Sequence, residues 1–329
     1  MPTLNRAAVA LVALALDGCL PTTTSTDSTH TDLPACAQET VEPGDASASP
    51  PVYFNHAYVV VTDPTDQALQ TNAYLASFVD VEVRTTVRPD STYTGTYLNF
   101  EHTYLEFFPT SAFDSVLGES GIALGDELEG GLAEIGAKWG DALDGEVSEI
   151  YPIERENADG ETVPWFDLVY PYWADTYAGA SINVWAMEYV PNAGETAPRT
   201  RQVERAVRYA PEKPARDVTD VLLEIPQPDL DLMRTTFSSL GFAVEDQGDG
   251  FRAVSPLDHG VGRAYHVQLA GADRVGLVAI ALAIDPATPS HVEPLGDGSL
   301  EVGVDAADQA TLWFYGADEA DRALLNDCR

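Results

Sequence analysis

The stretch that decides the fold is YFNHAYVVV, residues 53–61, which is followed by Asp63 and Pro64 as the start of a helix. Neighbouring side chains of a strand point to opposite faces of its sheet, so Ala57, Val59 and Val61 form an apolar face that a helix can cover. Phe54, His56 and Tyr58 are expected on the other face. The stretch therefore predicts a strand whose polar residues point away from the helix that follows it.

The same order of strand and helix recurs twice further along the chain. The strands that open the second and third copies are predicted at residues 122–124 and 218–225. The apolar residues of the three helices recur at spacings of three and four, as one buried helix face requires. They are Leu69, Ala73 and Ala76, then Leu128, Leu132, Ile135 and Trp139, and finally Leu230, Met233, Phe237 and Leu240.

Runs with strand character follow the helices. They lie at residues 80–87, 93–100 and 102–108, at 163–169 and 182–190, and at 242–245, 251–254 and 264–269. In the second copy a stretch rich in Gly, Glu and Asp, residues 141–162, interrupts the pattern. A strand, a helix and three strands make a βαβββ module. We therefore predict an α+β protein of repeated βαβββ modules, whose curved mixed sheets carry helices on the outer face and form a cup on the other.

The modules are expected at residues 52–115, 116–195 and 196–329, and the third ends in an irregular C-terminal extension. Three modules leave one sheet edge unpaired. Either the irregular tail at residues 275–315 covers this edge, or a second subunit covers it in a homodimer.

The N-terminus is typical of an export signal. Arg6 supplies a positive charge before an apolar run at residues 7–16, which is too short to span a bilayer. Residues 1–18 followed by Cys19 resemble a bacterial lipoprotein signal, in which the cysteine is lipidated; an ordinary secretory signal cut elsewhere is the alternative. Residues 19–51, rich in Thr, Ser and Pro, predict a flexible tether. We expect an exported protein, anchored by lipid on the outer or periplasmic side of a membrane.

Cysteine content and charge agree with this location. Without Cys19, the cysteines form one pair, Cys36 and Cys328, for which we predict a disulfide. The chain has 53 acidic and 17 basic residues and a formal net charge of −36. Such a surface repels phosphate backbones, so we expect no nucleic-acid partner and contact with a membrane only through the lipid anchor.

Four short segments resemble the vicinal oxygen chelate superfamily and its glyoxalase-like branch. They are NHAYVV at residues 55–60, YLEF at 104–107, SGIAL at 120–124 and WAMEY at 185–189. The chain is also similar to a group of uncharacterised exported bacterial proteins, which carry the sequence between RTTV at 84–87 and WAMEY. The resemblance covers residues 52–316 and implies the modular fold described above.

The resemblance also implies a metal site. In metal-using members of the superfamily, a histidine of the first strand and a glutamate of the last strand of each module converge on a divalent ion. His56, Glu106 and Glu188 match three of these positions, and Gly121, which cannot bind a metal, stands near the fourth. One Zn, Mn, Ni or Fe ion would suit one imidazole and two carboxylates, with no other cofactor expected. Alternatively, His56 is a hydrogen-bonded cleft residue and the two glutamates are exposed strand carboxylates.

Candidate ligand-binding residues are Tyr58, Tyr104, Arg84, Trp165 and Trp185. Aromatic walls bind flat small molecules, although they also fill the interior of a curved sheet. Arg84 could hold an anionic group by bidentate bonds, or form half of a surface ion pair. Motifs of serine hydrolases, P-loop proteins, dinucleotide-binding proteins and zincins are absent from the sequence. We expect a lipoprotein that binds a small ligand in the cup of modules one and two; the alternative is a divalent-metal-dependent lyase, isomerase or dioxygenase.

Overall fold

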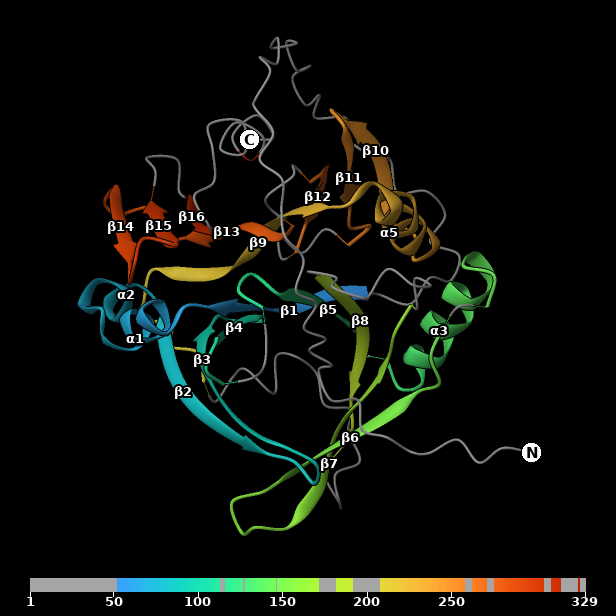
Figure 1. Cartoon of the computed structure of the whole chain (residues 1–329), viewed down its shortest axis with the longest axis horizontal. Coiled ribbons are helices and arrows are strands. Elements are labelled where there is room, and N and C mark those ends of the chain that lie inside the picture. Colours follow the sequence, from blue (N-terminus) through green and yellow to red (C-terminus); the bar gives the residue numbers. More distant parts are fainter. Residues whose placement is uncertain are drawn as a thin grey trace, which may run out of the picture.

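The computed structural model contains two curved mixed sheets of eight strands each, with few helices (Figure 1). This is the α+β class expected from the sequence. The structure describes residues 52–112, 116–126, 128–145, 147–171, 182–191, 208–257, 262–270, 275–304, 309–314 and 325. The positions proposed for lipidation and for a disulfide, Cys19, Cys36 and Cys328, lie outside these residues.

The first sheet has the strand order β2-β3-β4-β1-β5-β8-β7-β6. Its first half consists of β1 (Val52–Val61), α1 (Asp63–Thr71), α2 (Ala73–Phe78), β2 (Asp80–Val87), β3 (Thr92–Asn99) and β4 (Tyr104–Pro109). Its second half consists of β5 (Ser120–Asp126), α3 (Gly131–Ala142), β6 (Tyr151–Glu156), β7 (Thr162–Val169) and β8 (Ile182–Tyr189). Strand β1 pairs with β4 in parallel and with β5 in antiparallel orientation, so the first strands of the two halves meet at the centre.

The second sheet has the matching order β10-β11-β12-β9-β13-β16-β15-β14. It contains β9 (Ala215–Ile225), α5 (Gln227–Ser239), β10 (Ala243–Gln247), β11 (Gly250–Val254) and β12 (Ala264–Leu269). It continues with β13 (Gly276–Ile284), β14 (His291–Leu295), β15 (Leu300–Val304) and β16 (Gln309–Phe314). The expected irregular tail is therefore wrong for the described part of residues 275–315, because these residues form four paired strands that complete the second sheet.

The stretch at residues 141–162 also differs from its interpretation as an interruption. It contains β6, which is the end strand of the sheet. This strand pairs with β7 in antiparallel orientation, with Ile153 opposite Phe166. The first predicted helix is divided in two at Asn72. This residue ends α1, and its side chain accepts a hydrogen bond from the backbone N–H of Leu75 (2.8 Å) at the start of α2.

A β-bulge in β1 changes which residues share a face. The register shifts between Phe54 and His56, so these two side chains do not point to the same side as simple alternation predicted. Phe54 instead belongs to the core between the sheets, where its ring lies 6.4 Å from that of Tyr265 in β12. His56 remains on the concave face, together with Asn55, whose side-chain oxygen lies 3.0 Å from Nδ1 of the ring and accepts a hydrogen bond when that nitrogen is protonated.

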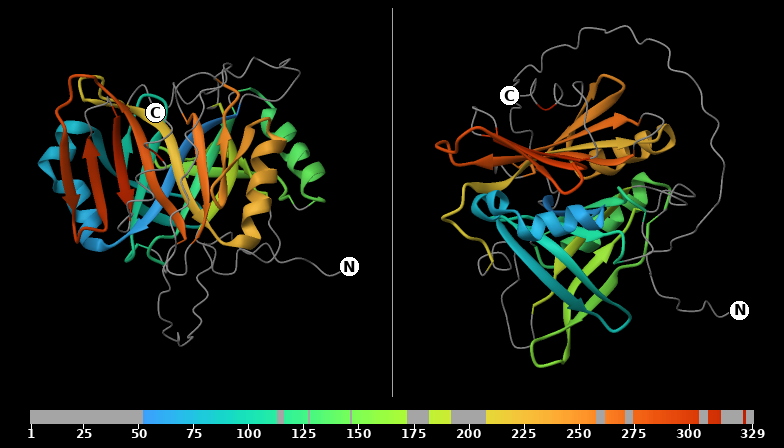
Figure 2. Two further views of the ribbon diagram at one scale, coloured as in Figure 1. Left: turned by 90° about the horizontal axis from the view of Figure 1, so that it is seen from above. Right: turned by 60° about the vertical axis from the view of Figure 1, so that its left-hand side comes forward.

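One large core lies between the two sheets. It is built from the apolar face of β1 (Ala57, Val59 and Val61), from helix residues such as Leu69 and Met233, and from the facing side of the second sheet. The helices thus cover the convex side of the first sheet at its ends, while the second sheet covers its centre (Figure 2). Hydrogen bonds also link the layers. Asp217 of β9 accepts bonds from the backbone N–H of His102 (3.1 Å) and from the hydroxyl of Thr103 (2.6 Å).

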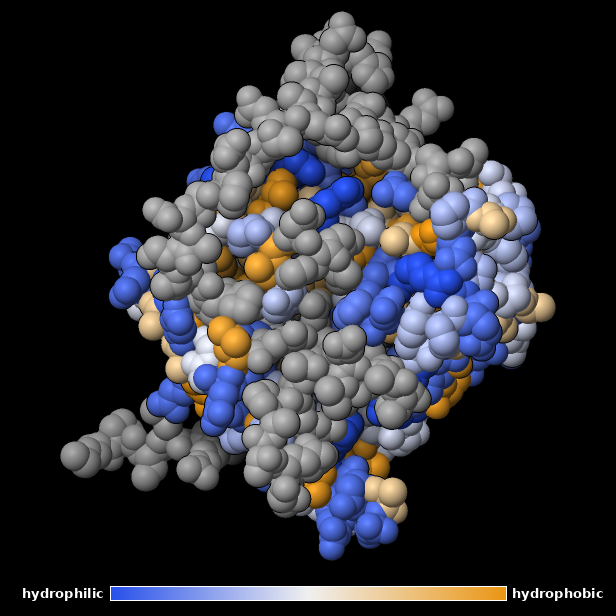
Figure 3. All heavy atoms as spheres, turned by 180° about the vertical axis from the view of Figure 1, so that it is seen from behind, coloured by the Kyte–Doolittle hydropathy of each residue, from blue (hydrophilic) through white to orange (hydrophobic). Residues whose placement is uncertain are grey.

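One face of the described surface can be judged by its hydropathy. Seen from behind, it is mainly hydrophilic, and apolar residues appear as small separate patches (Figure 3). Among the described residues, no helix combines the length and the apolar character needed to cross a membrane.

Candidate functional site

The concave face of the first sheet, called the cup below, gathers most of the residues proposed from the sequence. His56 lies on β1 beside Tyr104 of β4, and Tyr58 lies beside Glu106. These side chains are deeply placed: His56 is 5% exposed and Glu106 is 8% exposed. The parallel pairing of β1 with β4 therefore brings the histidine and the first glutamate to neighbouring strands on one face.

Glu106 is held in a buried polar network. Its carboxylate accepts a short hydrogen bond from the hydroxyl of Tyr97 on β3. Burial, and then the negative charge of Glu106, raise the pKa of Tyr97, which keeps its hydroxyl protonated as a donor. The guanidinium carbon of Arg84 on β2 lies 3.8 Å from the centre of the Tyr97 ring, in a cation–π arrangement. Three adjacent strands thus place a carboxylate, a phenol and a guanidinium in one network.

Aromatic rings fill the centre of the cup. The His56 ring stacks on Tyr104 (centroids 4.3 Å apart, planes at 15°) and meets the edge of Trp185 (5.2 Å, 69°). Tyr58 lies 6.0 Å from Trp185, and its hydroxyl accepts a hydrogen bond from the side-chain amide of Asn183 (2.5 Å). These contacts fix the orientations of the rings that the sequence assigned to a ligand pocket.

Glu188 does not join the other two proposed metal ligands. In β8, Ile182, Val184 and Ala186 face the core between the sheets, and Glu188 has the same parity. Its two carboxylate oxygens accept hydrogen bonds from the backbone N–H groups of Gly130 (3.0 Å) and Leu132 (3.2 Å) at the start of α3. Glu188 is therefore a helix-capping residue on the convex side, and the proposal of a ligand set made by His56, Glu106 and Glu188 is corrected.

At Gly121, the fourth expected ligand position, the rings of Tyr58 and Trp185 occupy the space that a side chain would need. A Cβ atom on Gly121 would lie 2.5 Å from Cε1 of Tyr58 and 2.8 Å from Cζ3 of Trp185, so any side chain there would displace both. Within the described ranges, no three His, Cys, Asp or Glu side chains are grouped closely enough to hold one metal ion. The residues of the cup thus do not fit the shared ion that the resemblance implied.

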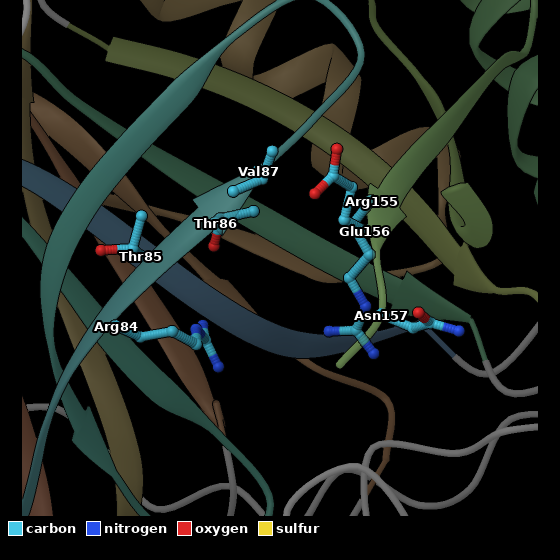
Figure 4. Close-up of a pocket in the computed structure, with 7 residues that line it drawn as sticks. All are labelled: Arg84, Thr85, Thr86, Val87, Arg155, Glu156 and Asn157. Carbon is cyan, nitrogen blue, oxygen red and sulfur yellow. The ribbon is translucent and has the colours of Figure 1, made fainter. Parts of the chain in front are cut away.

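A cavity of about 210 Å³ lies where the two ends of the first sheet approach one another, and it is called the seam cavity below. It is lined by residues 84–87 of β2 and residues 155–157 of β6 and its end. Figure 4 shows Arg84 and Arg155 reaching from these strands toward the same space. Arg155 is positioned by Trp165, whose ring centre lies 4.7 Å from its guanidinium carbon.

Arg155 was missed by reasoning from sequence. The sequence carries a signal for this strand, because the apolar Tyr151 and Ile153 are two residues apart and the charged Glu154 and Glu156 alternate with Ile153 and Arg155. It was overlooked because this strand was taken as an interruption. Arg84 and Trp165, which the sequence did indicate, lie on either side of the same seam.

The concave face of the second sheet holds a different polar group. His266 of β12 is fully buried, with Nε2 3.6 Å from Oδ1 of Asp220, and Asp220 also pairs with Arg263 (3.1 Å). Leu325 packs on the same face with Leu222 and other apolar residues. Leu325 therefore covers part of this face.

Comparisons with known proteins support the fold. No curated protein matches the chain. A hypothetical protein from Staphylococcus aureus superposes with a TM-score of 0.50 at 9% identity, over 74% of this chain and 95% of that chain, which shows similarity of fold alone.

Two further structures superpose less closely. A variant of homoprotocatechuate 2,3-dioxygenase from B. fuscum has a TM-score of 0.39 at 13% identity, over 84% of this chain and 75% of that chain. A fusion of a xylose isomerase-like TIM barrel with a 4-hydroxyphenylpyruvate dioxygenase has a TM-score of 0.40 at 13% identity, over 74% of this chain and 39% of that chain. The strongest finding comes from sequence, since the profile described as "Family of unknown function (DUF5829)" matches residues 54–313. The chain therefore belongs to the family of unknown function DUF5829.

Proposed function

We propose that the protein binds a small organic molecule at the seam cavity, on a fold of vicinal oxygen chelate type. The observation that carries this proposal is the buried polar network of Glu106, Tyr97 and Arg84 beside that cavity. Buried polar and charged groups reduce the stability of a fold unless they are fully paired, and such groups beside a cavity are a common feature of binding sites.

The size of the cavity limits the ligand. Its volume of about 210 Å³ is below the ~300–1,000 Å³ typical of sites for drug-sized molecules. A single ring with one or two substituents is of suitable size. The walls suit such a ligand, because Arg155 and Arg84 line the cavity and each guanidinium is backed by an aromatic ring, that of Trp165 or that of Tyr97.

The proposal is tested by measuring the tryptophan fluorescence of the protein while single-ring molecules are added. The panel includes neutral, anionic and cationic molecules. We expect at least one to change the emission saturably, and Trp165→Phe to remove most of that change because Trp165 contacts the cavity residue Arg155. Tyr97→Phe keeps the ring under Arg84 but removes the donor to Glu106, so it should weaken binding several-fold. Tyr265→Phe, a buried tyrosine in the second sheet, is the matched control.

Two results count against this function. The first is that no molecule of the panel binds saturably. The second is that Tyr265→Phe weakens binding as much as Tyr97→Phe does, because a loss of general stability would then explain both.

We also propose that the protein is exported and held at a membrane by lipid on Cys19. The support is the charged start at Arg6, the apolar run at residues 7–16 and the Thr-, Ser- and Pro-rich stretch that follows. Fractionation of a Cys19→Ser variant tests this anchor.

A further inference from the structure

The two ends of the first sheet face one another across the seam cavity. Strand β2 ends the sheet order on one side and β6 ends it on the other. The cavity between them is lined by residues of both strands, and in Figure 1 the curvature of the sheet brings these ends toward each other. A ligand in the cavity would therefore contact both halves of the first sheet.

Arg84 presents an unsatisfied donor in this region. Its side chain is only 14% exposed, and its nearest acid, Glu82, lies 3.8 Å from Nη1, which is too long for a hydrogen bond. Nη1 is buried without a hydrogen-bond partner among the described residues. Burial alone lowers the pKa of Arg84, but Tyr97, Tyr104 and Glu106 raise it above its ordinary value, so the group stays charged. A shift of the Arg84 side chain toward the cavity would let an oxygen of a ligand accept a hydrogen bond from this nitrogen.

The charge of the lining defines the ligand further. Among the lining residues, Arg84 and Arg155 are positively charged and Glu156 is negatively charged, while the carboxylates of Glu82 and Glu106 lie near Arg84 outside the lining. Figure 4 shows the carboxylate of Glu156 turned away from the two guanidinium groups. Because these carboxylates lie nearby and the chain has a formal net charge of −36, a monoanion meets less repulsion in the cavity than a dianion does.

We propose that the seam cavity binds the carboxylate of a small organic monoanion, held between Arg84 of β2 and Arg155 of β6. The planar guanidinium groups match the two oxygens of a carboxylate. Arg155 is already oriented by its stacking on Trp165, so little freedom is lost when it binds. This inference rests on the proposed small-molecule function and adds the chemical class of the ligand.

Calorimetric titration of the intact protein with benzoate and with benzamide tests the carboxylate, since the two probes have nearly the same shape but differ in charge. We expect benzoate to bind at least ~10-fold more tightly. Arg84→Gln and Arg155→Gln should each weaken benzoate binding ~10- to 100-fold and weaken benzamide binding much less, because benzamide loses wall contacts but no ion pair. Arg252→Gln is the matched control, because Arg252 is 18% exposed, lies 3.9 Å from Glu245 and belongs to the second sheet.

The outcomes separate the two proposals. Equal binding of benzoate and benzamide, or a benzoate preference that survives both arginine substitutions, overturns the carboxylate inference and leaves the small-molecule function standing. If neither probe nor any molecule of the fluorescence panel binds, the proposed function itself fails. Phenyl phosphate at pH 8, above its second pKa of ~6, should bind more weakly than benzoate; tighter binding would show a phosphate site and overturn the monoanion inference.

Discussion

Replacing Glu188 by alanine should destabilise the protein through helix α3, whether or not a metal ion is present. The start of α3 has Gly130 at its N-cap position, with a φ of 81° and no side-chain cap of its own. Glu188 supplies the missing acceptors to Gly130 and Leu132 from β8. The loss of a capping side chain costs ~0.5–2 kcal/mol, and the loss of a negative charge at a helix N-terminus adds ~0.3–1 kcal/mol. We therefore expect the free energy of unfolding to fall by about 1–3 kcal/mol.

Urea unfolding followed by circular dichroism measures this change. Glu188→Gln keeps one acceptor oxygen without the charge, so it should lose less than Glu188→Ala. Glu154→Ala, an exposed glutamate on the end strand β6, is the control and should shift stability by no more than ~0.5 kcal/mol. The capping explanation is refuted if Glu188→Ala unfolds at the same urea concentration as the control. It is also refuted if EDTA treatment of the unmodified protein reproduces the loss, because Glu188 would then act through a bound ion.

Two further predictions concern other parts of the chain. Hydrogen bonds, first of all from Ser299, lower the pKa of Asp297 to about 2 from its ordinary 3.8, so the stability that this carboxylate contributes is present above about pH 4 and is lost as the pH falls toward 2. Urea midpoints between about pH 5 and 2 should therefore fall less steeply in Asp297→Asn than in the unmodified protein, and identical slopes would contradict this. For the anchor, Cys19→Ser should move the protein from the membrane fraction to the soluble fraction of the cell envelope; retention in the membrane would contradict lipidation at Cys19.

The central strands were the most predictable part of the fold. Strand alternation correctly separates Ala57, Val59 and Val61, which face the core, from His56 and its neighbours, which face the cup. Alternation fails before His56, where a bulge adds one residue to β1, so that Phe54 faces the core and Asn55 faces the cup. A bulge depends on pairing with β5, which the residues of β1 alone do not reveal.

The end of the chain was less predictable because its second half-sheet lacks a helix. Strand β13 is a continuous apolar run, Gly276–Ile284, which is typical of a strand buried on both faces. The connection from β13 to β14 contains a short turn where the other three units have a helix. The expected βαβββ pattern needs a helix after the first strand. Because this unit has a turn there, the pattern does not predict its four strands, although the apolar run of β13 favours a strand.

The candidate site shows where a family resemblance and strand alternation conflict. WAMEY places a glutamate in the last strand, and the resemblance assigned it to the metal. Alternation in the same strand puts Glu188 on the same face as Ile182, Val184 and Ala186, which are buried against the second sheet. The requirement of the two-sheet core thus turns the carboxylate toward α3, and Trp185 takes the cup side beside Gly121.

The chemistry of the cup follows from this arrangement. With Glu188 on the other side, Glu106 is the carboxylate that the cup retains near His56, and it is already engaged by the hydroxyl of Tyr97. Arg84 lies beside this network, and its buried Nη1 has no hydrogen-bond acceptor within the part of the chain that the structure describes. A site with an engaged acid and a cation in need of an acceptor attracts an anion more strongly than a second cation. The carboxylate that we infer for the seam cavity would contact both arginines, one from each end of the first sheet.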